Sequence, residues 1–127
     1  MMAYRAEGVV IERGGREVLR AERFEVPAGG LAALVGPNGS GKTSLLEVLA
    51  LLRRPAGGRL WLFGEPVGGG APRPEIGYLP QAPYLFDRTV ASNVAWALRA
   101  RGVGGAEAAR RIAEALEQVG LGELRGR

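Results

Sequence analysis

The sequence predicts an α/β fold, and three observations lead to it. Polar and apolar residues alternate through residues 23–26, which is the period of a half-buried antiparallel strand. Residues 31–35 form a continuous apolar run of strand length, as expected for a buried parallel strand. A glycine-rich stretch then leads into residues 42–52, whose apolar positions have helical spacing. Strand, loop and helix follow one another as in an α/β domain.

Shorter elements fill the rest of the chain. The same patterns predict strands over residues 8–12, 17–26, 59–63 and 76–79, and helices over residues 90–101 and 106–119. Residues 64–74 are rich in Gly and Pro, which predicts a surface loop. Gly102 and Gly120 are placed to end the two later helices. Glu107 and Arg111 form an i,i+4 pair in the favourable orientation.

Two of the predicted helices carry an apolar stripe. The stripe consists of Leu45, Leu46, Leu49 and Leu52 in the first of them, and of Ile112, Leu116 and Val119 in the last. A stripe of this kind faces the core of a globular domain.

The composition is that of an ordinary globular protein, and it restricts the class of function. The chain has 127 residues, which suits a single domain, and no linker is evident. No apolar run approaches the roughly 18 residues of a membrane-spanning helix, and residues 1–7 lack the apolar core of a secretory signal. The absence of cysteine excludes disulfides and thiolate metal sites. The net charge is +4, but the basic residues are scattered, so a nucleic-acid surface is not expected.

The motif that carries chemistry is the glycine-rich stretch. Its residues fit the pattern G-x-x-x-x-G-K-[ST] of a phosphate-binding P-loop: Gly36, Pro37, Asn38, Gly39, Ser40, Gly41, Lys42 and Thr43. A predicted strand precedes it and a predicted helix follows it, which is the context that the motif requires. Glycines let the backbone approach a phosphate, and the amides and the helix start favour an anion. The sequence therefore predicts a site for ATP or a close relative.

Lys42 is the only lysine of the chain, although 17 residues are Lys or Arg. A lysine ammonium is a compact point charge, whereas a guanidinium is a wide planar fork. A tight phosphate cradle has room for the former, which agrees with a phosphate-binding role for Lys42. A glycine-rich turn that merely caps a helix would need neither this lysine nor the hydroxyl of Thr43.

The sequence resembles the ATP-binding subunit of an ABC transporter. The loop variant Gly-Pro-Asn-Gly-Ser-Gly-Lys-Thr is typical of that family, as is the preceding segment 26–30. Residues 76–81 resemble the segment that ends in the family's Q-loop glutamine, here Gln81. Residues 89–94 resemble the opening of its helical subdomain. The resemblance covers nearly the whole chain.

The resemblance implies an incomplete P-loop NTPase core of ABC type. It implies an N-terminal antiparallel β subdomain with the loop strand over residues 1–35, a segment from P-loop to Q-loop over 36–82, and the start of a helical subdomain over 88–127. ATP and Mg²⁺ are the implied ligands. The residues implied to bind the nucleotide are those of the loop, Gly36 to Thr43, together with Ser44 and Arg13.

Individual roles follow from the same resemblance. Lys42 would contact the outer phosphates and act in catalysis, and the Thr43 hydroxyl would ligate Mg²⁺. Gln81 would contact Mg²⁺ and the attacking water, and would couple the site to membrane subunits. Arg13 stands near the place of an aromatic residue that stacks on adenine in the family. Because a guanidinium plane can also stack on a base, Arg13 is a candidate substitute, and Tyr4 lies too early in the chain.

Three parts of the family's machinery are missing from the sequence. No serine is followed by Gly-Gly, as the signature motif requires, and there is no histidine to act as the switch residue. Asp87 is the only aspartate, and Arg88 follows it where the catalytic glutamate would stand. We therefore expect one incomplete ABC ATPase domain over residues 1–127, which binds Mg-nucleotide without turning it over.

The implied partners are transmembrane permease subunits and a second ATPase subunit. The implied location is the cytoplasmic face of the inner or plasma membrane, without direct insertion. Two segments resemble the ATPases of tungstate or molybdate importers, residues 51–55 and 83–86. Two alternatives differ in class: another P-loop enzyme such as a small-molecule kinase, or a non-catalytic nucleotide-binding fragment. A GTPase is disfavoured, because its base-reading element needs a second lysine.

Overall fold

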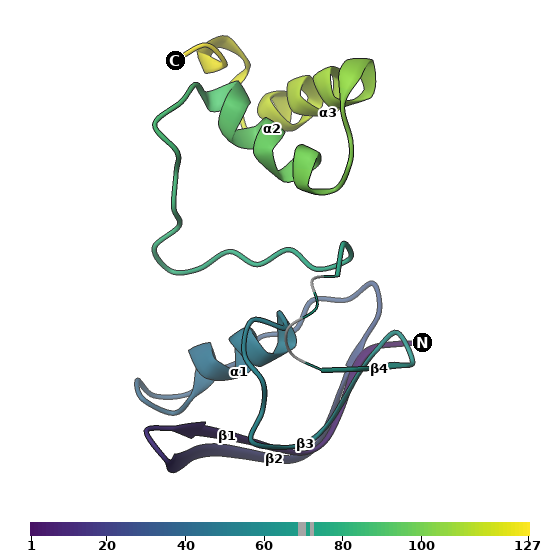
Figure 1. Ribbon diagram of the computed structural model, residues 1–127, viewed down its shortest axis with the longest axis vertical. Coiled ribbons are helices and arrows are strands. Elements are labelled where there is room, and N and C mark those ends of the chain that lie inside the picture. Colours follow the sequence, from purple (N-terminus) through teal and green to yellow (C-terminus); the bar gives the residue numbers. More distant parts are fainter. Residues whose placement is uncertain (69–70, 72) are drawn as a thin grey trace. The chain divides into compact units, whose positions relative to one another are not determined.

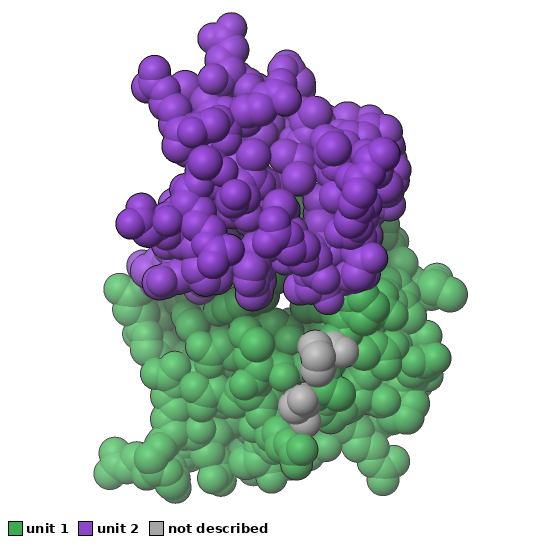
Figure 2. Space-filling view, turned by 45° about the horizontal axis from the view of Figure 1, so that its top comes forward, with its two compact units in different colours: residues 1–78 green, residues 79–127 purple. Residues whose placement is uncertain are grey.

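The computed structural model describes residues 1–68, 71 and 73–127, and the chain divides into two units, residues 1–78 and 79–127. Figure 2 distinguishes the two units by colour. Within the described residues, no helix combines the length and the apolar character needed to cross a membrane.

A long hairpin forms the base of the first unit. Strands β1 (Met2–Arg13) and β2 (Arg16–Pro27) pair antiparallel along their whole length. They are joined by Gly14 and Gly15, which both have positive φ, the conformation that a two-residue hairpin turn favours. The turn fixes the register and so places Arg13 at the tip of the hairpin.

Two further strands complete an antiparallel sheet of order β2-β1-β3-β4. They are β3 (Gly57–Leu62), which pairs with β1, and β4 (Glu65–Val67), which pairs with β3. The register of β1 against β3 shifts between Glu7 and Val10. At that shift Gly58 approaches the backbone of Gly8 so closely that any Cβ at Gly58 would overlap the Gly8 carbonyl.

Helix α1 (Lys42–Leu49) packs on the sheet (Figure 1). The core of the first unit consists of apolar residues from β1, β3, α1 and the turn after α1: Ala6, Val9, Ile11, Leu45, Val48, Leu51 and Leu60. The hydroxyl of Tyr4 donates a 3.0 Å hydrogen bond to the carbonyl of Leu49, and burial raises the pKa of this phenol. Tyr4 therefore binds the C-terminal end of α1, away from the glycine-rich loop.

The second unit contains α2 (Val90–Ala100), α3 (Gly105–Gln118) and a short 3₁₀ turn, η1 (Gly122–Leu124). Thr89 is the N-cap of α2, because its side chain accepts a hydrogen bond from the amide of Ser92 at 3.1 Å. Gly102 and Gly120 have positive φ and follow the ends of α2 and α3, as predicted. The predicted Glu107–Arg111 pair is present, with Nε and Oε1 2.7 Å apart.

The α/β fold class, with an antiparallel sheet first and helices later, is confirmed, but two predicted strands are wrong. Neither Leu31–Val35 nor the segment 76–79 is a strand in the described structure. The hydrogen-bonded sheet runs only from β2 to β4, so these two segments have no described strand beside them. Leu31 is fully exposed and Val35 is 88% exposed, although a buried strand was expected.

Helix α1 is shorter than predicted, and its buried face differs from the expected stripe. The chain leaves the helix at Leu51, which has positive φ, while the amide of Leu52 bonds to the carbonyl of Glu47 as in a Schellman cap. Leu51 thereby enters the core and Leu52 is 65% exposed. The buried face is Ser44, Leu45 and Val48, whereas Leu46 is 45% exposed.

Three element boundaries and buried positions also differ from the prediction. Strand β4 lies inside the predicted loop 64–74, of which Gly69, Gly70 and Pro72 lie outside the described residues. Strand β1 starts at Met2, earlier than expected. In α3, Leu116 is buried as predicted, but Val119 is 65% exposed and follows the last helical residue.

Candidate functional site

The glycine-rich loop leads into α1 through Gly41, the N-cap residue, which has φ 90°. A Cβ at this position would lie 3.1 Å from the Cβ of Leu19 on β2, so the helix begins directly against the hairpin. A side chain at position 41 would meet both a strained backbone and a close neighbour. The absence of a side chain at Gly41 therefore sets how close the loop lies to the sheet.

Lys42 folds back over the loop that precedes it. Its Nζ donates hydrogen bonds to the carbonyls of Gly36 and Pro37, the latter at 2.6 Å, and lies 3.4 Å from the hydroxyl of Ser40. The amide of Ser40 closes the turn by donating to the Pro37 carbonyl at 3.2 Å. The ammonium is thus held at the mouth of the loop by neutral oxygens. A phosphate oxygen is a stronger acceptor than a carbonyl and can take their place.

The loop is narrow at its first glycine. A Cβ at Gly36 would lie 2.9 Å from the Ser40 hydroxyl oxygen, closer than side chains normally approach. Gly39 has φ 82°, which favours glycine. The residues at the start of the loop, from Gly36 to Gly39, are exposed to solvent. The loop backbone is therefore exposed to solvent, and the Lys42 ammonium lies at its mouth.

The first turn of α1 offers donors and no acidic side chain. The first helical amide bond is that of Leu45 with the carbonyl of Gly41, at 2.9 Å. The amides of Lys42, Thr43 and Ser44 precede it, and the first amides of a helix have no intrahelical acceptor. They point along the axis that carries the positive end of the helix dipole. The arrangement suits an anion that has several oxygens.

Two hydroxyls follow Lys42 and have different surroundings. Thr43 is exposed, whereas Ser44 is only 1% exposed. Hydroxyl oxygens are ligands that Mg²⁺ accepts when phosphate oxygens complete its shell. Within the described part of the chain, there is no group of three or more acidic side chains that could hold a metal ion. Thr43 is therefore the loop residue that could ligate Mg²⁺ beside bound phosphates.

Arg13 lies at the same end of the helix. Its Nε donates a 2.9 Å hydrogen bond to the hydroxyl of Ser44, which joins the hairpin tip to the first turn of α1. The structure therefore brings Arg13 and Ser44 into contact at the start of the helix that carries Lys42 and Thr43. The motif alone did not indicate this contact. The length of the β1–β2 hairpin and its Gly14–Gly15 turn were the signal that could have revealed it.

Gln81, the other predicted site residue, belongs to the second unit. It is exposed and lies outside the helices and strands, in the segment before α2.

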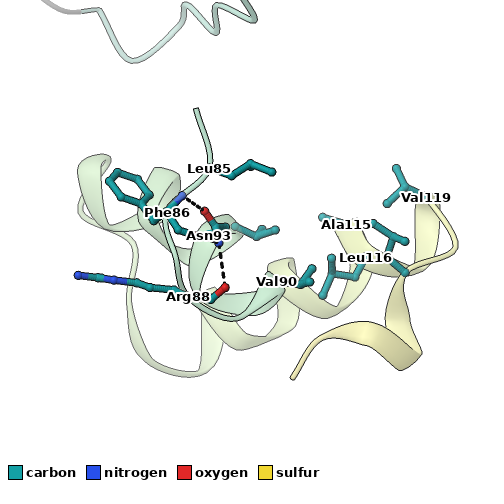
Figure 3. A pocket seen from close by; sticks show the side chains of 10 residues that line it. Leu85, Phe86, Arg88, Val90, Asn93, Ala115, Leu116 and Val119 are labelled. Carbon is teal, nitrogen blue, oxygen red and sulfur yellow. Dashed lines mark hydrogen bonds between the residues drawn. The ribbon is translucent and has the colours of Figure 1, made fainter. Parts of the chain in front are cut away.

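The second unit has a pocket of about 560 Å³, which Figure 3 shows from close by. Its lining is mostly apolar: Leu85, Phe86, Arg88, Val90, Asn93, Val94, Ala115, Leu116, Val119 and Leu121. One of its walls is fixed by Asn93, whose Oδ1 accepts from the amide of Phe86 at 2.8 Å and whose Nδ2 donates to the Phe86 carbonyl at 3.0 Å. This role of Asn93 was not predicted from the sequence. The only sequence signal for this role was the position of Asn93 one turn after Thr89, the N-cap of α2.

A protein-family model described as "ABC transporter" matches residues 19–127. The methionine import ATP-binding protein MetN of Thermobifida fusca (strain YX) is 43% identical over 123 residues, which cover 90% of this chain and 38% of that protein. The Fe(3+) ions import ATP-binding protein FbpC 1 of Rhodococcus jostii (strain RHA1) is 40% identical over 124 residues, which cover 94% and 35%. The cell division ATP-binding protein FtsE of Escherichia coli (strain K12) is 36% identical over 115 residues, which cover 85% and 52%. The chain thus spans between about a third and a half of these curated relatives.

Two solved structures share the fold of this chain over most of its length. The structure of cbiO1 from Clostridium perfringens, part of the ABC transporter complex cbiONQ, has a TM-score of 0.84 at 22% identity and covers 99% of this chain and 53% of that chain. A bacterial Atm1-family ABC exporter with ATP bound has a TM-score of 0.78 at 28% identity, with coverage of 94% and 21%.

Proposed function

This chain belongs to the ABC transporter family, and we propose that it is part of an ATP-binding subunit that couples ATP to membrane transport. The observation that carries the proposal is the position of Lys42, whose ammonium is held by the carbonyls of Gly36 and Pro37 at the start of α1. An ammonium, free helix amides and an open glycine loop meet there. Together they form a site for the phosphates of a nucleotide.

The residues of the loop take distinct parts in this proposal. Lys42 exchanges its carbonyl partners for the outer phosphate oxygens of ATP. The backbone of Gly36 to Gly41, with Pro37, Asn38, Gly39 and Ser40 between them, surrounds the phosphates. Ser44 adds a hydroxyl at the helix start. Bound Mg²⁺ would neutralise charge on the phosphates, and the Thr43 hydroxyl would hold it.

Hydrolysis needs more than this loop. Gln81 would orient the attacking water, by analogy with the glutamine of the family's Q-loop. The sequence contains no histidine, and Asp87 is its only aspartate. We therefore propose that residues 1–127 form one incomplete ABC ATPase domain, with its parts at 1–35, 36–82 and 88–127, which binds nucleotide without turnover.

The proposed partners are transmembrane permease subunits and a second ATPase subunit. The proposed location is the cytoplasmic side of a membrane, with the chain peripheral to it. The named relatives act in methionine import, Fe(3+) import and cell division, so import is the direction that two of the three favour. A tungstate or molybdate importer is the narrower proposal, and it rests on the sequence of residues 51–55 and 83–86.

A titration with a fluorescent ATP analogue and Mg²⁺, with phosphate release followed in the same samples, tests the proposal. Lys42→Ala should abolish binding, and neither protein should release phosphate. Thr43→Ala should lose only the increase in affinity that Mg²⁺ brings. Thr89→Ala, which removes a threonine hydroxyl in the second unit, is the matched control and should bind as the parent does. Nucleotide binding that survives in Lys42→Ala would contradict the proposed site. Phosphate release that disappears in Lys42→Ala would contradict the proposed absence of turnover.

A further inference from the structure

Arg13 has no acidic partner among the described residues, unlike two other arginines of the same hairpin. Arg20 and Arg23, on the same hairpin, pair with the carboxylates of Glu17 and Glu25. Arg13 forms no ion pair with any described residue, and its one side-chain hydrogen bond goes to the neutral hydroxyl of Ser44. The guanidinium has five N–H donors, so most of them remain for another acceptor.

The position of Arg13 is electrostatically unfavourable when no ligand is bound. Arg13 and Arg16 are directly opposite each other at the end of the β1–β2 ladder. Like charges in such a pair destabilise a sheet. The positive end of the α1 dipole and Lys42 add to the same field. Positive charge thus gathers at one end of α1 without a described carboxylate paired to Arg13, and an anion would relieve the repulsion.

We propose that Arg13 is a phosphate-binding residue of the nucleotide site. Resting on the proposed function, this inference assigns Arg13 to the phosphate chain of the nucleotide and not to its base. The Ser44 hydroxyl engages Nε and so holds the guanidinium beside the helix start, with its two terminal nitrogens free to donate. Arg13 is exposed, so a ligand can reach it.

The consequence is a change in what the site recognises. A side chain that stacks on the base adds nothing to the binding of a ligand without a base, whereas a guanidinium on phosphate adds to the binding of both kinds of ligand. Arg13 should therefore add to the binding of ATP and GTP alike, and inorganic tripolyphosphate should compete with both. The contact is charge-assisted, so removing it should weaken binding about tenfold. Its contribution should shrink at high salt, because exposed charges are screened.

The experiment uses three probes, ATP, GTP and tripolyphosphate, against the parent chain and its variants, with far-UV circular dichroism to confirm folding. Arg13→Gln should weaken all three by the same factor. Arg13→Lys keeps the charge but not the planar fork, and should weaken all three probes equally, by a smaller factor than Arg13→Gln does. Arg59→Gln is the matched control: it removes an exposed arginine from β3 and should leave every affinity unchanged.

Two results separate failure of this inference from failure of the proposed function. If Lys42→Ala leaves all three affinities unchanged, the nucleotide site itself is wrong. If Lys42→Ala abolishes binding but Arg13→Gln weakens ATP and spares tripolyphosphate, Arg13 contacts the base and the inference is overturned. It is overturned as well if Arg13→Gln binds all three probes as tightly as the parent does. Equal weakening of the three probes supports the assignment, and Arg13→Lys allows the test even if Arg13→Gln does not fold.

Discussion

Asn93 bonds to both backbone groups of Phe86, accepting from the amide at 2.8 Å and donating to the carbonyl at 3.0 Å. Its Nδ2 also lies 3.0 Å from the carbonyl of Thr89. One half-buried side chain therefore connects the segment before α2 to the first turn of that helix (Figure 3).

Asn93→Ala should destabilise the second unit by about 2 kcal/mol, because several partly buried backbone groups lose their partner. Hydrogen exchange at residues 86–89 should accelerate, and urea unfolding should report the loss of free energy. Thr89→Ala serves as the comparison, since it removes the helix cap and an exposed hydroxyl contact with Ser92, and should cost about 1 kcal/mol. Equal effects of the two substitutions would contradict the special position of Asn93.

Gly58→Ala should be among the most damaging small substitutions in the first unit. Gly58 has φ 91°, and a Cβ there would overlap the backbone of Gly8, which cannot move aside as a side chain could. The expected loss in free energy of unfolding is about 3 kcal/mol or more. Gly57→Ala is the matched control, because its Cβ would meet only the side chain of Val10 at 3.8 Å. Chemical denaturation of both variants checks the difference, which should exceed the error of the method.

The first turn of α3 should respond to acid. Hydrogen bonds from Arg110 and Arg111 lower the pKa of Glu107 to about 2. A lowered pKa means that the ionised carboxylate stabilises the fold above the ordinary pKa of 4.5, and that this stability is lost as the pH falls from there toward 2. Glu107→Gln should therefore be less stable than the parent at pH 7 and should match it near pH 2.

Urea midpoints of both proteins across this pH range measure the effect. Glu117→Gln, on the same helix, is the control, because Glu117 forms no ion pair with any described residue. A gap between parent and Glu107→Gln that persists unchanged at pH 2 would show that the ion pairs are not its source.

The segment Leu31–Val35 should limit solubility. Leu31 is fully exposed, Val35 is 88% exposed and Leu34 is 43% exposed. An apolar segment with unpaired backbone groups invites association with other chains. Replacing Leu31 and Val35 by Thr should raise the concentration at which light scattering first appears, and should leave the free energy of unfolding unchanged within about 0.5 kcal/mol. A lowered free energy of unfolding would mean that the two side chains stabilise the fold.

Strands over residues 8–12 and 17–26, β3 and the two later helices were predicted because their signals are local. Gly14 and Gly15 specify a tight turn, and Thr89 specifies a helix start within four residues. The strands at 31–35 and 76–79 failed for the opposite reason. An apolar run favours burial, but a strand also needs a hydrogen-bonding neighbour, and no described strand provides one.

The same difference between local and long-range signals applies to the candidate site. The loop and its lysine were predicted because a phosphate cradle imposes a fixed spacing within eight residues. The contact between Arg13 and Ser44 joins residues 31 positions apart, and depends on the register of β1 against β2 and on where α1 meets the sheet. Likewise, Leu51 enters the core through a left-handed turn that no helical periodicity indicates.

The pairing of β1 with β3 sets an order for the folding of the first unit. The β1–β2 hairpin closes through a two-residue turn, and hairpins of this kind form in roughly 1–10 μs. Gly57 reaches Val10 only after the chain has closed a long loop that contains β2, the glycine-rich segment and α1. The entropy of that closure must be overcome before β3 contributes its contacts. A ligand that already holds residues 36–44 in place removes part of this entropy beforehand. Nucleotide bound at the proposed site during refolding should therefore hasten completion of the sheet.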